Sequence, residues 1–160
     1  METPAGRLTH VDERGAARMV DVSAKDVTAR TATASGRVLV SAEVIDLLRG
    51  RGMPKGDTLA VARLAGIMGA KLTPTLIPLC HPLALSGVEV DLNVADDAVQ
   101  IRALVRTTDR TGVEMEALTA VSVAALTVVD MVKAVDKAAV ITDIRVETKT
   151  GGKSGEWSRP

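Results

Sequence analysis

The stretch Thr111–Lys137, TGVEMEALTAVSVAALTVVDMVKAVDK, combines a long apolar run with charged residues at both of its ends. The run from Ala117 to Val129 predicts a helix from about Gly112 to Val135, roughly 36 Å long. Because apolar residues surround its middle, we expect that part to be buried on every side. The run is shorter than the about 20 residues needed to cross a bilayer. Chargeable groups therefore lie at both ends of a buried helix.

The two charged ends of this predicted helix are too far apart to form one compact cluster within one chain. Glu116 and Asp130 would be separated by roughly 21 Å along the helix axis and about 40° around it. If both ends serve one site, two copies of the chain must meet. The spacing is a first indication of a homo-oligomer with sites between subunits.

Composition is typical of a globular protein with a sizeable core. The chain has 160 residues, 46% of them hydrophobic, and its 20 basic residues balance 20 acidic ones. We expect one domain, residues 1–160, and no attraction to nucleic acid or to an anionic membrane. Trp157 is the sole tryptophan and Phe and Tyr are absent, so aromatic platforms for stacking bases are missing. The single cysteine and the lack of a signal peptide indicate the cytoplasm.

Hydrophobic periodicity predicts an α+β fold. The order of strand, two helices, two strands, helix and strand is that of a ferredoxin-like split βαβ fold, with a four-stranded antiparallel sheet and helices on one face. The prolines of residues 73–84 predict an ordered, non-helical crossing. Flexible tails are expected at about residues 1–7 and 150–160. The predicted strands are Ala29–Val40, Val88–Val94, Val99–Val105 and Ala139–Lys149, and the first two helices follow Ser41 and Asp57 or Thr58.

The two carboxylates at the start of the long helix have two interpretations. Thr111 and Glu114 have the spacing of a capping box, and acidic residues suit a helix N-terminus. Alternatively, Glu114 and Glu116 accept paired N–H donors, as on the edge of guanine or a pterin.

The other end of the helix is equally open to two readings. Asp130, Lys133 and Lys137 share one face. They form either a surface salt bridge or, beside a buried surface, a pair that transfers protons.

Three further segments carry candidate groups. Lys55 lies in a Pro-Lys-Gly turn that is either simply solvated or close to a phosphate. Cys80 and His81 lie between prolines, with no spacing typical of a metal site, so His81 is either part of a half-buried loop or a positioned hydrogen-bond partner. Lys149 and Lys153 flank Gly151 and Gly152 in a segment that is either a solvated tail or a phosphate-grasping flap.

Several motifs, in this order, resemble the molybdenum cofactor biosynthesis protein C family, the cyclic pyranopterin monophosphate synthases. The resemblance runs from about Leu8 to Trp157. Its motifs are LTHVD, MVDVSAK, KGD, LIPLCHP, TGVEMEALTA, DMVKAVDK and GGKSG.

The resemblance implies a lyase of molybdenum cofactor biosynthesis that uses no metal and no organic cofactor. Its substrate is 3′,8-cyclo-7,8-dihydroguanosine triphosphate, a cyclised GTP-derived nucleotide. Acid–base chemistry opens the purine ring and rebuilds it as cyclic pyranopterin monophosphate, and pyrophosphate leaves. The family is a homohexamer, a trimer of dimers, with sites at the dimer interfaces.

The resemblance assigns each role to the residue that occupies the same place in the matching motif. The resemblance makes Asp130 the catalytic acid or base, with Lys133 and Lys55 as essential lysines. Its substrate-binding residues correspond to Leu79, Cys80 and His81 in the loop, Glu114, Met115 and Glu116 at the start of the helix, and Lys149.

Two other classes of protein compete with this reading. A ferredoxin-like domain can be a non-catalytic module that binds a small ligand, since fold alone does not decide function. An RNA-binding ferredoxin-like domain is disfavoured by the missing aromatic residues and the balanced charge.

Overall fold

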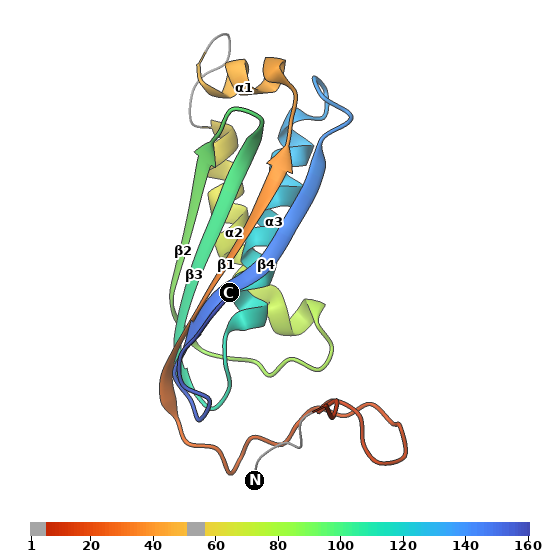
Figure 1. Ribbon diagram of the computed structural model, residues 1–160, viewed down its shortest axis with the longest axis vertical. Coiled ribbons are helices and arrows are strands. Elements are labelled where there is room, and N and C mark those ends of the chain that lie inside the picture. The colour runs from red at the N-terminus through yellow and green to blue at the C-terminus, as the bar shows by residue number, and fades with distance from the viewer. Residues whose placement is uncertain (1–5, 51–56) are drawn as a thin grey trace.

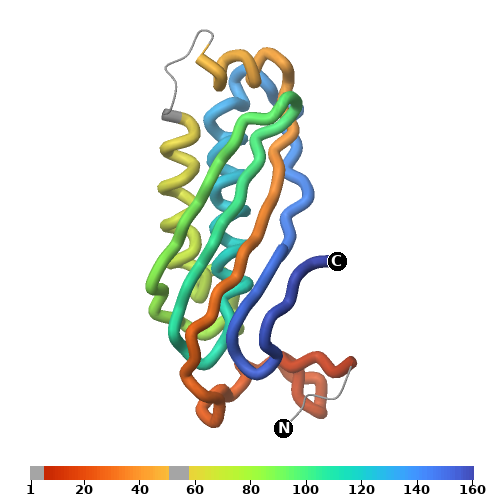
Figure 2. Tube along the Cα trace, turned by 60° about the vertical axis from the view of Figure 1, so that its left-hand side comes forward, coloured from red at the N-terminus to blue at the C-terminus, as the bar shows by residue number. Residues whose placement is uncertain are grey.

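A single antiparallel sheet forms one layer of the protein, and helices α2 and α3 form the other (Figures 1 and 2). The computed structural model describes residues 6–50 and 57–160. The helices are α1 (Ala42–Leu48), α2 (Asp57–Leu76) and α3 (Glu114–Val132). The strands are β1 (Thr28–Leu39), β2 (Leu85–Val94), β3 (Ala98–Asp109), β4 (Val140–Thr150) and β5 (Trp157–Ser158).

The sheet confirms the predicted ferredoxin-like arrangement and adds one short strand to it. Its order is β2-β3-β1-β4-β5, so β1 lies in the centre between β3 and β4, and every pairing is antiparallel. The additional strand, β5, pairs Trp157 with Lys149, and the Arg159 N–H donates to the Glu147 carbonyl over 2.8 Å. The segment expected to be a flexible tail therefore contains a strand that extends the sheet by main-chain hydrogen bonds.

Small apolar side chains let the two long helices approach closely. A Cβ on Gly66 would lie 2.9 Å from the Ala120 carbonyl oxygen, and one on Gly69 would lie 2.8 Å from the Val123 side chain. On the other side of α3, a Cβ on Gly36 of β1 would lie 2.7 Å from Val121. Helix α3 is thus held between β1 and α2, at distances that only glycine permits.

Helix α2 is longer than predicted, because the segment expected to be non-helical begins inside it. Pro74 lies within the helix and cannot donate to the Ala70 carbonyl, its partner in a regular helix. The buried Thr73 hydroxyl donates to that carbonyl over 2.9 Å. The side chain replaces the missing backbone donor, so the helix continues to Leu76.

Helix α3 corrects another expectation, because it is not buried all round and one side of it is exposed to solvent. Ala120 and Ala124 are fully buried, whereas Leu126 is 60% exposed and Met131 is 38% exposed. The helix ends at Val132, earlier than expected, where the Val135 and Asp136 N–H groups both donate to the Val132 carbonyl. Its length and composition alone would allow a membrane span, but its contacts with the sheet and α2 are those of a core helix.

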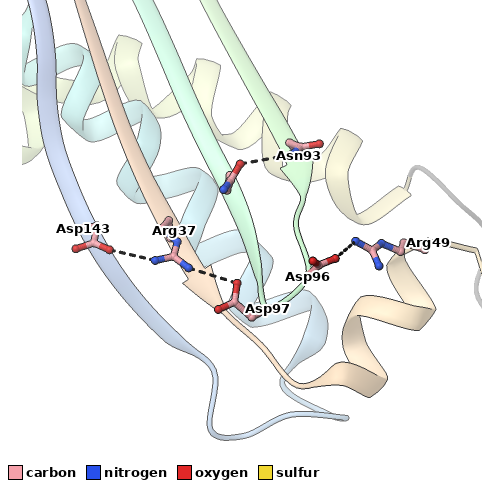
Figure 3. A network of polar contacts seen from close by, with 7 residues as sticks. Arg37, Arg49, Asn93, Asp96, Asp97 and Asp143 are labelled. Carbon is pink, nitrogen blue, oxygen red and sulfur yellow. Dashed lines mark hydrogen bonds and ion pairs between the residues drawn. The ribbon is translucent and has the colours of Figure 1, made fainter.

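Charged residues tie the β2–β3 turn to its neighbours at the end of the sheet near α1 (Figure 3). Arg37 on β1 contacts both Asp97 of the turn, at 3.4 Å, and Asp143 of β4, at 3.6 Å. Asp143 has a φ of 56° and lies where β4 bulges against β1. Arg49 after α1 contacts Asp96 at 3.1 Å. This network holds the turn, β1 and β4 in fixed relation.

We expect Thr73→Val to lower the free energy of unfolding by about 1–3 kcal/mol, because the buried Ala70 carbonyl loses its donor. Urea denaturation followed by circular dichroism measures the loss. Thr127→Val is the matched control, since the Thr127 hydroxyl donates to the Val123 carbonyl, which also receives the helix's own backbone bond. Equal losses in the two variants would contradict this account of Pro74.

Candidate active site

The predicted site residues divide between the two ends of α3, which lie at opposite ends of the molecule (Figure 1). At the N-terminal end, contacts and charge interactions connect four residues, which we call the Glu114 cluster: Cys80, Glu114, Glu116 and Lys149. At the C-terminal end lie Asp130 and Lys133, which we call the Asp130 pair. Lys55 lies outside the described residues. Within one chain, the described candidates therefore form two separate groups, which we call the candidate half-sites.

An ion pair between helix α3 and strand β4 organises the Glu114 cluster. Lys149 Nζ lies 2.9 Å from Glu114 Oε1, and both side chains are about two-thirds to three-quarters buried, with 33% and 28% of their surface exposed. A carboxylate in the first turn also interacts favourably with the helix dipole. Glu114 therefore lies between a lysine and a helix N-terminus, both of which attract a negative charge.

The capping box expected from Thr111 and Glu114 does not form. The N-cap is Val113, which makes no side-chain capping hydrogen bond. Val113 is fully buried, and its carbonyl accepts the Ala117 N–H over 3.0 Å. Burial of the Val113 side chain places the N-cap two residues after Thr111. The Glu114 carboxylate is then not used in a capping box and instead pairs with Lys149.

Gly112 is a residue of this site that the sequence analysis did not single out. A Cβ at this position would collide with both carboxylate oxygens of Glu114. The absence of a side chain at Gly112 therefore provides the space in which the Glu114 carboxylate lies. The only signal in the sequence was its place inside the TGVEMEALTA motif.

Glu116 is an acidic side chain placed almost wholly inside the protein. It is 3% exposed, and its Oε2 atom has no hydrogen-bond partner among the described residues. Burial raises the pKa of Glu116 to about 7. A hydrogen bond from a backbone N–H opposes this rise, and the charge of Glu114 adds to it. A carboxyl with this pKa changes its protonation state near neutral pH, as general acids and bases do.

The Leu79–His81 loop leads from α2 toward Glu116. The Cys80 N–H donates to the Ile77 carbonyl over 3.1 Å, which turns the chain at the end of α2. Burial, followed by the charge of Glu116, raises the pKa of the Cys80 thiol. His81 Nε2 lies 2.6 Å from the Val20 carbonyl oxygen. The thiol is thus protonated at neutral pH, and the imidazole is tied to the N-terminal segment.

The Asp130 pair is on the surface of the single chain, which agrees with the surface salt bridge and not with a pair beside a buried surface. Lys133 Nζ lies 2.7 Å from Asp130 Oδ1, with side-chain exposures of 65% and 68%. An exposed pair of this kind contributes at most about 1 kcal/mol to stability. Both groups are open to a ligand or to a second copy of the chain.

No group of three or more His, Cys, Asp or Glu side chains is arranged to hold a metal ion within residues 6–50 and 57–160. The site offers acid–base and charge-pairing groups: two carboxylates, a thiol, an imidazole and a lysine at one end, and a carboxylate and a lysine at the other.

We expect Gly112→Ala to move the Glu114 carboxylate while the fold survives, because the clash falls on the far end of a flexible side chain. A crystal structure of the variant should show the Glu114–Lys149 ion pair broken. Gly87→Ala is the control, since its Cβ would meet the Arg106 side chain at an ordinary 3.6 Å. An intact ion pair in Gly112→Ala would refute this role for Gly112.

We expect Glu116→Gln to remove a pH dependence of stability. Folding raises the pKa of Glu116 from 4.5 to about 7. Below pH 4.5 the carboxyl is neutral in both the folded and the unfolded chain, and the fold has its full stability. As the pH rises through 7, the buried carboxyl must ionise and that stability is lost. The Gln variant should therefore match the wild type at pH 4 and exceed it by about 3 kcal/mol at pH 8. Denaturant titrations across this range measure the difference.

Glu156→Gln, in the exposed C-terminal segment, is the control and should follow the wild type at every pH. Parallel stability curves for Glu116→Gln and the wild type would contradict the raised pKa.

Comparison with known proteins agrees with the resemblance over nearly the whole chain. The profile described as the MoaC family matches residues 19–152. A relative named cyclic pyranopterin monophosphate synthase, from a Nocardioides species, is 83% identical over 96% of this chain and 96% of its own length. A protein of the same name from Streptomyces coelicolor is 79% identical over 99% of this chain and 93% of its own length.

A more distant relative carries the same function in its name. Cyclic pyranopterin monophosphate synthase 2 of Mycobacterium tuberculosis is 61% identical over 97% of this chain and 93% of its own length. Such identities far exceed what a shared fold alone requires, and they cover both half-sites. The chain therefore belongs to the MoaC family.

Proposed function

We propose that this chain is a cyclic pyranopterin monophosphate synthase, an enzyme of molybdenum cofactor biosynthesis. It converts 3′,8-cyclo-7,8-dihydroguanosine triphosphate to cyclic pyranopterin monophosphate and pyrophosphate by acid–base rearrangement. The observation that carries the proposal is the near-full-length identity to relatives that bear this name. The enzyme works as a soluble protein of the cytoplasm.

The Glu114 cluster suits the purine end of this substrate. The N1–H and exocyclic amino group of guanine present two adjacent donors, which match carboxylate oxygens. Glu114 forms an ion pair with Lys149, and Glu116 Oε2 is buried with no hydrogen-bond partner among the described residues. In this assignment Glu114 accepts from the guanine edge, and Lys149 keeps its carboxylate in place.

Glu116 is suited to proton transfer during ring opening and closure. Its pKa of about 7 lets it hold a proton when the site is empty and lose it when a cationic or donating group approaches. Met115 lies on the same turn and is 37% exposed, so it can cover one face of the bound ring. Leu79, Cys80 and His81 complete the pocket from the opposite segment.

The Asp130 pair suits the steps at the ribose and triphosphate. Asp130 acts as the catalytic acid or base, and Lys133 holds its carboxylate and neutralises the developing phosphate charge. Lys55, outside the described residues, is assigned to the leaving pyrophosphate from its motif. An exposed pair becomes effective when a second subunit excludes water from it, because charge interactions strengthen in a less polar medium.

An exposed apolar stripe on α2 supports assembly of several copies. Its members recur at helical spacing and are each largely open to solvent in the single chain. They are Val61 (43%), Leu64 (62%), Met68 (60%), Leu72 (49%) and Leu76 (54%). Large exposed apolar surfaces are typical of protein–protein contact sites. We assign it to contacts within a homohexamer, a trimer of dimers, in which dimer interfaces join the two half-sites.

The decisive experiment incubates the purified protein with the cyclised GTP substrate and measures pyrophosphate and pterin product. Wild-type protein should form both. Asp130→Ala and Lys133→Ala should each lose activity by roughly 100-fold or more, since they remove an acid–base group. If no preparation of the wild-type protein forms product, the proposed reaction is wrong.

Mixing two inactive variants tests whether subunits share a site. Asp130→Ala and Glu114→Ala chains, unfolded and refolded together, should regain part of the wild-type activity, because some interfaces then carry both intact half-sites. Each variant refolded alone is the control. If the mixture stays as inactive as the controls, the half-sites are not completed across an interface.

A further inference from the structure

The motif Met19–Lys25, MVDVSAK, has no role in the function proposed above. It belongs to residues 6–27, which we call the N-terminal arm. The arm leaves β1 and runs outside the layers of sheet and helix (Figure 1), and most of its side chains are exposed. Its hydrogen bonds to His81 and Arg110 lie beside the Glu114 cluster.

The first contact joins the arm to the substrate-binding loop. His81 Nε2 lies 2.6 Å from the carbonyl oxygen of Val20. A carbonyl can only accept a hydrogen bond, so Nε2 must carry the proton. In the neutral ring, Nδ1 is then unprotonated and is an acceptor.

The arm is itself held in the shape that makes this contact. The Asp21 carboxylate accepts the Ser23 N–H over 2.9 Å, and the Lys25 N–H donates to the Val22 carbonyl over 3.0 Å. These bonds form a tight turn directly after Val20. Hydrogen bonds from the backbone and side chain of Ser23 lower the pKa of Asp21.

A second contact ties the arm to the approach to α3. Arg110 Nε donates to the Lys25 carbonyl over 3.2 Å. Arg110 directly precedes the TGVEMEALTA motif, and its own N–H is held by Asp109 over 2.8 Å. The motif Met19–Lys25 therefore bridges both segments of the substrate pocket, the loop that carries His81 and the start of the helix that carries Glu114.

We propose that the Val20 carbonyl is a positioning group that holds His81 as the Nε2–H tautomer and leaves Nδ1 as the atom that accepts a proton or hydrogen bond from the substrate. The tautomer follows from the contact alone. The assignment of Nδ1 to the substrate rests on the proposed function. The arm is thus a structural part of the active site.

The tautomer is measured on the full-length, ligand-free protein. We label histidine with nitrogen-15 and record long-range proton–nitrogen correlations at a pH where the ring is neutral. The spectrum of His81→Gln identifies the signals of His81 against those of His10. The expected pattern has the proton on Nε2 and a strongly downfield, unprotonated Nδ1. A proton on Nδ1 would overturn the proposal, whatever reaction the protein catalyses.

Two substitutions separate the functions of the two ring nitrogens, because each keeps the hydrogen-bonding group of only one of them. In His81→Gln, the amide nitrogen can still donate near the Nε2 position, but no acceptor remains at Nδ1. In His81→Asn, the amide oxygen lies near the Nδ1 position, and the donor to Val20 is lost. We expect the Gln variant to lose activity by roughly tenfold or more and the Asn variant to be the more active of the two.

Limited trypsin digestion reports the state of the arm in the same variants. Arg18 and Lys25 flank the contact at Val20 and are exposed. Cleavage after them should be as slow in His81→Gln as in the wild type and faster in His81→Asn. The opposite order of activity, or equal cleavage in the two variants, would overturn the proposal.

Failure of this proposal is distinguishable from failure of the proposed function. If both His81 variants are fully active while the wild type forms product, the positioning role is wrong and the reaction stands. If the wild type forms no product, the reaction is wrong, and the spectrum still decides the tautomer.

Discussion

The close packing of α3 between the sheet and α2 is the constraint on which the rest of the structure depends. The core contains no aromatic side chain and is built from alanine, valine and other aliphatic residues. Small side chains bury enough apolar surface only if the elements approach closely. Gly36, Gly66 and Gly69 permit this approach, since a Cβ at any of them would press into α3. The helix is consequently fixed on two sides along most of its length.

A helix held in this way determines where the chemistry can be. Its first turn places Glu114 against Lys149 and buries Glu116, whereas its last turn leaves Asp130 and Lys133 in solvent. The same two types of side chain, a carboxylate and a lysine, therefore have different properties at the two ends. Burial raises the pKa of Glu116 toward neutrality, because a charge loses its hydration there. In the proposed hexamer, a second subunit supplies an equivalent environment for the exposed pair.

Much of the fold and of the candidate site could be predicted from the sequence. Alternation of apolar residues located the four long strands, and Ser41 begins α1 with its hydroxyl accepting the Val44 N–H, as its residue type predicts. The exceptions have local causes. Pro74 did not break α2, because a neighbouring threonine replaced the missing donor. Thr111 did not cap α3, because the buried Val113 begins that helix. The strand β5 was missed because two residues carry no periodic signal.

The candidate site could likewise be predicted from the sequence only in part. Motifs identified Glu114, Glu116, Asp130 and the loop residues as candidates, but not the contacts that give each its properties. The pairing of Glu114 with Lys149 joins residues of α3 and β4, and the contact of His81 with Val20 joins a loop to the N-terminal arm. Contacts between segments distant in sequence leave no periodic trace in either segment. The role of Gly112 is also invisible in sequence, because it consists in the space left for another residue's carboxylate.

The sequence by itself determined the elements, their order and the types of reactive group, because periodicity, capping and motif spacing act over a few residues. Only the tertiary structure decided which end of α3 is buried. Burial depends on β1 and α2, which come from other parts of the chain and approach α3 through glycines. It therefore also decided that Glu116 is an acid poised near neutral pH, while Asp130, on the same helix, is an exposed partner of Lys133.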